Sequence, residues 1–352
     1  MSRLTRVEAQ ERNRTRVLAA ARDEFAERGY RDAKIDAIAE RAELTRGAVY
    51  SNFPGKRALY FAVLAGLAEQ APALSPAPAP GRTTGDALAA LARAWLARLP
   101  TSAESARLGM DVLGEVMADE ATRQPYAQLM SLDAVLLGLA LERLRPDGRL
   151  VRVAETVLTA LHGASQLAAA APGFVEPFNV VSACEQLAYL NVDDGWLELP
   201  FTTRVQTVDE PWSPPAAWDS VRAEEVSLDA DGVVAVLGLH RAASVEHAVR
   251  AAPADTAVTA VLVSGAPREL IPLARLAVAE LTGCLRQAFP EYAWPRLRVV
   301  CDGTGELAAA VGVPAVSDST EVAVRIACGR VVARSDGYGA CHVTAAAKAP
   351  AP

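Results

Sequence analysis

The chain has 352 residues, of which 51% are hydrophobic and 22% charged, and this composition predicts a globular protein of two or three domains with sizeable cores. No apolar run approaches the roughly 20 residues that span a bilayer, and the N-terminus lacks the apolar segment of a secretory signal. From these features we expect a cytoplasmic protein rather than a membrane-spanning or secreted one.

The net charge of −7 is unevenly distributed along the chain. Residues 1–60 contain 13 Lys and Arg against 9 Asp and Glu, which gives a local charge of +4 and leaves −11 for the remainder. Because electrostatic attraction acts locally, an acidic total does not exclude DNA as a partner of the basic N-terminal region.

The N-terminal region, residues 1–70, is predicted to be a compact unit of short helices. Apolar residues recur at helical spacing from residue 12 to residue 70, with breaks at Gly29 and at the Pro54-Gly55 pair. The following stretch "APALSPAPAPGRTTG" favours an extended connector, because repeated prolines cannot continue a helix. Residues 84–190 return to long helical patterns and are predicted to form a second, all-helical domain.

The remainder of the chain changes character twice. Residues 191–225 are rich in Pro, Thr and Trp without helical period, and we expect a linker. Residues 226–347 alternate apolar strand patterns with helical ones in the order β-α-β-α-β-α-β-β. This order predicts an α/β layer fold that ends in a hairpin.

The five cysteines show no metal-binding or redox spacing. They form no C-x-x-C pair and no zinc-ligand pattern, so we expect buried thiols and neither a metal nor a cofactor. Cys328 and Cys341 could lie close to each other in the fold, so a redox switch formed by these two cysteines is the less favoured alternative. The full set is Cys184, Cys284, Cys301, Cys328 and Cys341.

Two short helices within residues 35–53 have the pattern of a helix-turn-helix. Thr45 occupies a good N-cap position for the second helix, while Leu44 and Val49 are placed to hold it against the first and Phe53 to close its end. The residues left to face outward or to flank the exposed side are Thr45, Arg46, Gly47, Ala48, Tyr50, Ser51 and Asn52.

This outward set suits the major groove of double-stranded DNA. Arg46 can pair with guanine edges, Gly47 permits close approach, and hydroxyl groups can bond phosphates. Lys56 begins the following helix, where its charge can clamp the DNA backbone. Arginines of the N-terminal arm, including Arg14, can add sequence-independent attraction. The alternative is a structural helical bundle in which Arg46 and Lys56 are merely solvated.

Residues 25–64 resemble the TetR family of transcriptional regulators. The resemblance is carried in one register by "FAERGY", "IDAIAERA", "TRGAVYSNFPGK" and "ALYFAVL". Two positions depart from the family pattern: Glu43 stands where glycine is usual, and Arg57 stands where an acidic residue is usual, adding positive charge near DNA. The resemblance implies a non-enzymatic homodimer, most often a repressor, that binds a roughly palindromic operator.

For residues 84–190 the same resemblance implies a regulatory domain that dimerises through its last two long helices and holds a small-molecule effector. We expect these helices at residues 150–171 and 177–190. Candidate effector-binding residues are aromatic, methionine or polar side chains that stand within apolar helical stretches. For most of them the alternative is a place in the ordinary hydrophobic core or in the dimer interface. They are Trp95, Met110, Met117, Tyr126, Met130, His162 and Gln166.

Residues 299–337 resemble the C-terminal half of thioredoxin-like domains. In that fold the redox cysteines follow the first strand, near "LGLHRAASVEHAV", where this chain has Ala242, Ala243 and Ser244. A thiol-disulfide enzyme needs a nucleophilic thiolate at such a helix start, so we expect a degenerate domain without oxidoreductase activity. Redox sensing by another cysteine and binding of a partner protein remain the alternatives for this domain.

Overall fold

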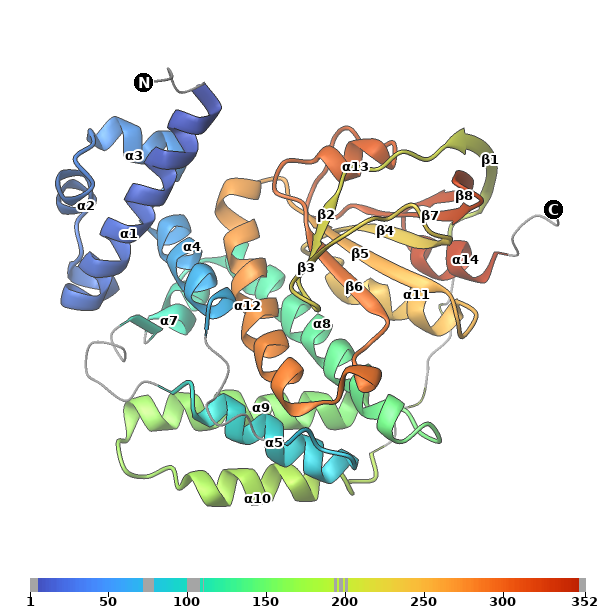
Figure 1. Cartoon of the computed structure of the whole chain (residues 1–352), viewed down its shortest axis with the longest axis horizontal. Helices are drawn as coiled ribbons and strands as arrows, with labels where there is room; N and C mark the ends of the chain where they lie inside the picture. Colours follow the sequence, from blue (N-terminus) through green and yellow to red (C-terminus); the bar gives the residue numbers. More distant parts are fainter. Residues whose placement is uncertain are drawn as a thin grey trace.

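The structure is a computed structural model that describes residues 6–71, 79–99, 108–109, 111–192, 195, 199 and 202–347. Figure 1 shows three regions: an N-terminal helical head, a layer of long helices, and an α/β region, with one helix, α12, running between them. Among the helices of these described ranges, none combines the length and apolar character needed to cross a bilayer.

Four helices form the head: α1 (Arg6–Asp32), α2 (Ile35–Arg41), α3 (Arg46–Asn52) and α4 (Lys56–Glu69). Gly29, with φ of 75°, interrupts the regular backbone near the end of α1. The head core holds Val49 and Phe53 at 1% exposure each, as the sequence pattern predicted. An aromatic cluster reinforces this core, because the ring of Tyr60 lies 5.3 Å from Phe25 and 4.7 Å from Tyr30 between centroids.

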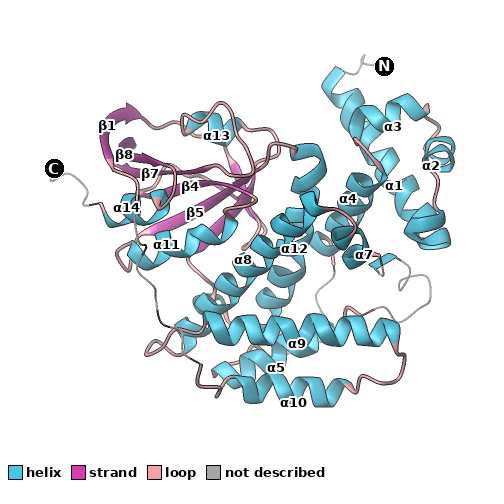
Figure 2. Ribbon diagram, turned by 180° about the vertical axis from the view of Figure 1, so that it is seen from behind, coloured by secondary structure: helices cyan, strands magenta, loops and turns pink. Residues whose placement is uncertain are grey.

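The middle of the chain is helical, as expected for residues 84–190. A capping box at Thr83 and Asp86 begins its first helix. Figure 2 shows α9 and α10 side by side below α8 and α12. The described helices of this region are α5 (Thr84–Leu96), α7 (Val112–Met117), α8 (Glu120–Leu144), α9 (Val151–Ala170) and α10 (Pro177–Leu187).

The C-terminal region contains a six-stranded mixed sheet in the order β1-β8-β7-β4-β5-β6. Strands β4, β5 and β6 are parallel, whereas β7 runs antiparallel to β4, and β8 antiparallel to β7. The strands are β1 (Gln206–Pro211), β2 (Ala217–Asp219), β3 (Glu224–Val226), β4 (Gly232–Gly238), β5 (Ala257–Val263), β6 (Leu297–Cys301), β7 (Glu321–Ala327) and β8 (Arg330–Asp336). The helices are α11 (Val245–Ala251), α12 (Pro267–Ala288), α13 (Glu306–Ala310) and α14 (Ala340–Ala346), with 3-10 turns η1 (Ala242–Ser244) and η2 (Glu291–Ala293). The predicted alternation of strands and helices from β4 to β8 is therefore observed.

The prediction of a linker over residues 191–225 is wrong for its second half. Strand β1 pairs antiparallel with β8 at the edge of the main sheet, and β2 pairs with β3 in a separate hairpin. The Trp212 indole donates a hydrogen bond of 2.7 Å to the carbonyl of Leu228, which anchors the segment. The local sequence shows little sign of β1 because an exposed edge strand that ends in proline has no apolar alternation.

The two faces of the sheet bury different groups of side chains. Alternate residues of β4, such as Val234 and Val236, belong to a core shared with Leu307 of α13 and with Trp212. Their neighbours Val233 and Ala235 belong to a larger core that also includes the head and the helical region. One face of the sheet is therefore continuous with the helical part of the molecule.

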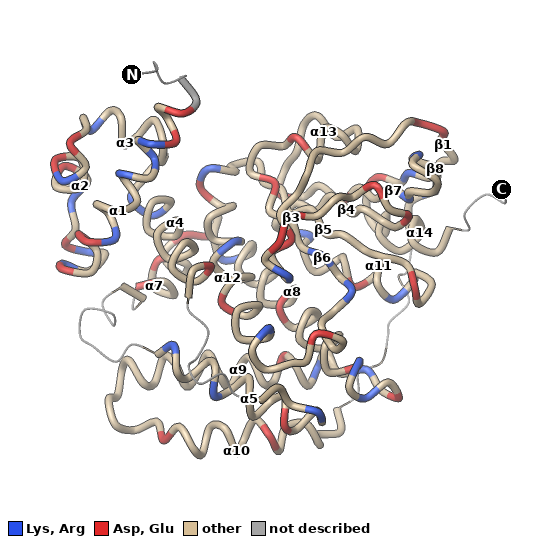
Figure 3. Tube along the Cα trace, in the orientation of Figure 1, with Lys and Arg blue, Asp and Glu red and all other residues tan. Residues whose placement is uncertain are grey.

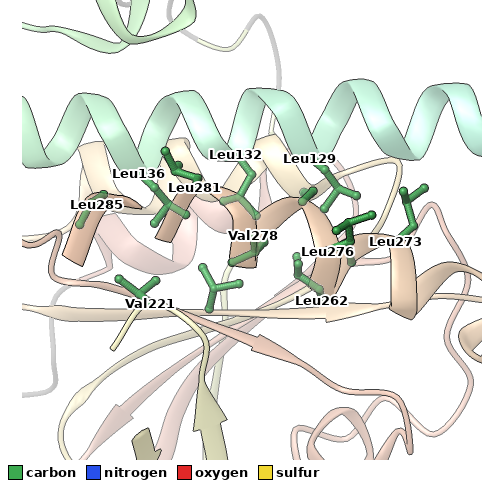
Figure 4. Close-up of a cluster of buried hydrophobic side chains, with 14 of the residues drawn as sticks. Leu129, Leu132, Leu136, Val221, Leu262, Leu273, Leu276, Val278, Leu281 and Leu285 are labelled. Atoms are coloured by element: carbon green, nitrogen blue, oxygen red, sulfur yellow. The ribbon is translucent and has the colours of Figure 1, made fainter. Parts of the chain in front are cut away.

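Helix α12 makes this continuity possible, so the C-terminal region is not an independent appendage. Its residues pack against α4, α5 and α8 as well as β5 and β6. In Figure 4, Leu276, Val278 and Leu281 of α12 lie among leucines of α8 and Leu262 of β5. The physical reason is its composition, because α12 has a broad apolar face whose residues are mostly buried, and such a face must be covered by neighbouring elements.

Candidate functional site

The turn between α2 and α3 is shaped by its backbone hydrogen bonds. The amides of Glu43 and Leu44 donate to the carbonyls of Glu40 and Ala39, each at 2.9 Å. Glu43 has φ of 51°, which is the left-handed conformation that favours glycine. The departure from the family pattern noted at Glu43 therefore lies at a position where a side chain strains the backbone.

Helix α3 begins as the sequence predicted. The Thr45 hydroxyl accepts a hydrogen bond of 3.2 Å from the amide of Ala48, which fixes the first turn. Val49 is buried against the head, so the opposite side of α3 faces solvent. The first turn of the helix is thus held in place independently of any partner.

The solvent-facing side of α3 presents polar groups that converge. The Arg46 side chain is 61% exposed and pairs with Asp36 of α2 at 3.2 Å. Its guanidinium also lies 5.5 Å from the ring centroid of Tyr50, which is itself 40% exposed. Gly47 is exposed, and a Cβ at this position would contact only the Thr45 hydroxyl, at 3.8 Å, so a partner surface can approach the backbone there. Ser51 is also exposed, although its hydroxyl donates to the carbonyl of Ala48 at 2.8 Å.

Two of the predicted interface residues do not face outward. Asn52 is 6% exposed, and its amide donates to the Ala48 carbonyl at 2.8 Å, because Asn52 lies on the same face of α3 as the buried Val49. Lys56 reaches back across the head, where its ammonium donates to the carbonyl of Arg31 at 3.0 Å and lies 4.7 Å from the ring centroid of Tyr30. In this arrangement Lys56 joins α4 to the end of α1.

The expectation that Arg57 adds charge near DNA is wrong. Its guanidinium binds Asp119 at 2.7 Å and also pairs with Glu269 of α12. Of the arginines expected in an N-terminal arm, those from Arg6 onward lie instead on α1, which begins at Arg6, and Arg3 lies outside the described residues. Arg14 stacks over the Phe53 ring at 4.6 Å from its centroid. Figure 3 shows basic and acidic segments alternating along the head, so α3 is surrounded by both signs of charge.

A pocket of about 440 Å³ lies among α7, α8 and α9 and brings together three of the predicted effector-binding residues. Tyr126 and Met130 line it from α8, and His162 lines it from α9. Burial lowers the pKa of His162, so the neutral imidazole is favoured. Trp95 lies behind this histidine with ring centroids 4.9 Å apart, and its indole donates to Ser165 at 2.9 Å.

The other predicted effector-binding residues are not brought to this pocket. The Met117 side chain is 66% exposed, and Gln166 is exposed on α9, because both lie on the outward sides of their helices. Met110 lies outside the described residues. Ser131, Glu155 and Thr159 line the pocket without having been singled out, since isolated polar residues on a helix carry no pattern of their own.

The cysteines are free thiols, and three of them, Cys184, Cys284 and Cys341, are buried. Burial raises the pKa of Cys184 to about 11 and the pKa of Cys284 and Cys301 to about 12. A thiol with a raised pKa is a poor nucleophile at neutral pH. Cys328 is exposed in the turn between β7 and β8, whereas Cys341 is a buried residue of α14, so the two thiols differ in their access to solvent.

Sequence reasoning missed the contacts that join α12 to the head. Arg275 of α12 forms a bidentate ion pair with Glu69 of α4 at 2.6 and 2.8 Å. Arg268 donates to the carbonyl of Ser51 at the end of α3 at 3.1 Å. The one available signal was the helical pattern of residues 267–288, whose apolar residues indicated a packed helix without naming its partners.

Comparison with known proteins concerns chiefly the head. Residues 17–63 match the family model described as bacterial regulatory proteins, tetR family. A stretch of 65 residues is 48% identical to the HTH-type transcriptional regulator SrpR of Pseudomonas putida and covers 18% of this chain and 30% of that protein. A stretch of the same length is 48% identical to the uncharacterized HTH-type transcriptional regulator TtgW, also of Pseudomonas putida, covering 18% of this chain and 48% of that protein.

The matched region thus spans less than half the length of either relative. Among solved structures, a TetR transcriptional regulator from Rhodococcus sp. RHA1 is 18% identical with a TM-score of 0.36, covering 51% of this chain and 95% of that one. The match of residues 17–63 to the tetR family model agrees with the geometry of α2 and α3, two short helices joined by a tight turn as in a helix-turn-helix.

Proposed function

We propose that this chain is a TetR-type transcriptional regulator that binds double-stranded DNA through the exposed side of α3. The observation that carries the proposal is the polar face of that helix, where Arg46, Tyr50 and the accessible backbone at Gly47 lie together. Arg46 is placed to read a guanine edge, and Tyr50 and Thr45 to bond phosphates. Because Asn52 and Lys56 are engaged within the head, we assign them a positioning role.

The proposal includes a homodimer that joins two such heads. Large apolar side chains are exposed along the end of α9 and along α10: Leu167, Phe174, Phe178 and Tyr189 are 46%, 71%, 74% and 68% exposed. Large apolar side chains exposed in this way are typical of a protein interface. Two copies joined there would present two recognition helices to the half-sites of a palindromic operator.

We further propose that a small molecule in the pocket among α7, α8 and α9 releases the protein from its operator in the cytoplasm. The pocket volume of about 440 Å³ suits a small organic ligand. Such a ligand lowers DNA affinity only if it binds the released conformation more tightly than the DNA-bound one.

For the C-terminal region we propose a thioredoxin-like domain that has lost redox chemistry. The order of elements from β4 to β8 supports this assignment, and η1 with Ala242 and Ser244 occupies the place where redox cysteines would stand. Glu321 of β7 forms an ion pair with Arg241, the residue before η1, so Arg241 has a structural role. The raised pKa values of the Cys284 and Cys301 thiols argue against redox sensing by these two cysteines.

Selection of bound fragments from genomic DNA by the purified full chain tests the proposal. The wild-type protein is expected to enrich a palindromic motif, whereas the double variant Arg46→Ala/Tyr50→Ala is expected to lose it. Arg296→Ala provides a matched control, because Arg296 is an exposed arginine that pairs with Asp255 in the α/β region. Equal enrichment by all three proteins, or salt-sensitive binding without any motif, would contradict DNA reading by α3.

A further inference from the structure

A second cavity, of about 680 Å³, lies between the head and the C-terminal region. Its walls come from α1 and α4 on one side and from α12, the β2 hairpin and β6 on the other. This interdomain cleft is separate from the helical pocket, since the two share no lining residue. Figure 3 shows basic segments where α12 faces the head.

The charges that line the interdomain cleft are predominantly positive. Four arginines line it, Arg14, Arg268, Arg275 and Arg286, against the single carboxylate of Glu69. Arg14 meets no carboxylate within ion-pair distance among the described residues. Burial lowers the pKa of Arg14; the charge of Glu11 on the same helix raises it, and the nearby charge of Arg275 lowers it. Arg14 and Arg275 therefore repel each other, and an anion placed between them would relieve this repulsion.

The cleft also offers an unsatisfied hydroxyl and apolar surface. Thr282 lines the cleft at 1% exposure, and its hydroxyl has no hydrogen-bond partner in the described part of the molecule. A buried polar group without a partner is costly, so a bound acceptor or donor would be favoured there. Ile271 and Val300 supply apolar walls, and Trp218, 56% exposed, supplies an aromatic face at the rim.

From these features we propose that the interdomain cleft binds a small organic anion with a flat apolar body and one carboxylate, sulfonate or phosphate group. Arg14 and Arg275 bind the anionic group, because guanidinium groups match such oxygens with paired hydrogen bonds. The apolar body packs on Ile271, Val300 and the Trp218 ring. The cavity volume lies within the roughly 300–1,000 Å³ of small-molecule sites.

Because the cleft lies between the head and the C-terminal region, a ligand bound there would influence how the two are held together. A ligand held by Arg14 of α1 and Arg275 of α12 contacts both the head and the C-terminal region. It would compete with Glu69 for Arg275 and so change how α12 holds α4. This consequence for DNA binding rests on the proposed function, whereas ligand binding itself does not.

Binding of 8-anilinonaphthalene-1-sulfonate to the full chain, followed by fluorescence without DNA, tests the site. We expect saturable binding that is displaced by 2-naphthoate but not by its neutral amide. The double variant Arg14→Gln/Arg275→Gln is expected to weaken binding about tenfold, and Arg296→Gln to leave it unchanged. Trp218→Phe is expected to reduce energy transfer from tryptophan to the bound probe.

The variant Glu69→Gln separates anion binding from structural damage. It breaks the same ion pair as Arg275→Gln but frees the arginine, so we expect severalfold tighter probe binding. Absence of saturable binding, equal affinity in all variants, or weaker binding to Glu69→Gln would overturn the proposal. If the double variant does not fold, the single variants Arg14→Gln and Glu69→Gln decide the matter by their opposite signs. Since no DNA is present, failure here leaves the DNA-binding proposal intact.

Discussion

The substitution Glu280→Gln is expected to stabilise the fold at alkaline pH and to have little effect in acid. Glu280 lies on α12, and burial raises its pKa from 4.5 to about 7. Asp133 on α8 is 2% exposed with one carboxylate oxygen unpaired, and burial and the charge of Glu280 also raise its pKa. The interface between α8 and α12 thus holds two acids that favour the protonated form.

The direction of the pH dependence of stability follows from proton binding. The folded pKa of Glu280 exceeds the unfolded one, so between them the folded state keeps a proton that the unfolded state has lost, and stability falls as pH rises. A difference of about 2.5 pKa units corresponds to about 3.4 kcal/mol, which partial solvent exposure reduces to about 1–3 kcal/mol. Glutamine has the same size and no charge, so the variant removes this cost.

Urea unfolding at about pH 4 and about pH 8 measures the effect. Glu280→Gln is expected to raise the free energy of unfolding at the higher pH alone, and Glu225→Gln, at an exposed position of β3, to leave it within about 0.5 kcal/mol. A variant that is destabilised at the higher pH, or whose effect is equal at both, would refute the reasoning.

Three further changes test the fold. In a double-mutant cycle measured by urea unfolding, the losses of unfolding free energy caused by Arg57→Ala and Glu269→Ala are expected to be coupled by about 1–2 kcal/mol. Purely additive losses would contradict a direct ion pair between α4 and α12. Glu43→Gly is expected to raise the free energy of unfolding by about 0.5–1 kcal/mol, because it removes a side chain from a left-handed backbone; a loss of stability would show that this strain is absent. When the native protein is treated with a disulfide reagent, one thiol is expected to react quickly, and Cys328→Ser is expected to abolish this fast reaction. A fast reaction that remains in the variant would show that another thiol is also accessible.

The head was the part of the fold most accessible from sequence. Thr45, Val49 and Phe53 take the cap and core positions that their spacing indicated, because these roles are set by residues within one or two turns. Lys56 begins a helix as predicted, but its contact with Arg31, like the burial of Asn52, was not foreseen, since the direction of a side chain at a helix end depends on which neighbour it meets. Local pattern therefore located the recognition helix but not all of its outward side chains.

Long-range contacts were the part that sequence could not supply. The role of Arg57 depends on Glu269, more than two hundred residues away, and nothing in either local pattern indicates the other. Strand β1 was missed for a related reason, because an edge strand is defined by its partner β8 and its own residues are mostly exposed. The interdomain cleft exists only because α12 brings such distant segments together.

The most direct test of DNA reading by α3 is the affinity of the full chain for a labelled duplex carrying the selected motif, measured by fluorescence anisotropy at fixed salt. We predict that Arg46→Ala weakens binding by about 1–3 kcal/mol and relaxes the preference at one base position in each half-site, while Arg296→Ala changes neither. If Arg46→Ala binds with unchanged affinity and unchanged base preference, the exposed side of α3 does not read DNA.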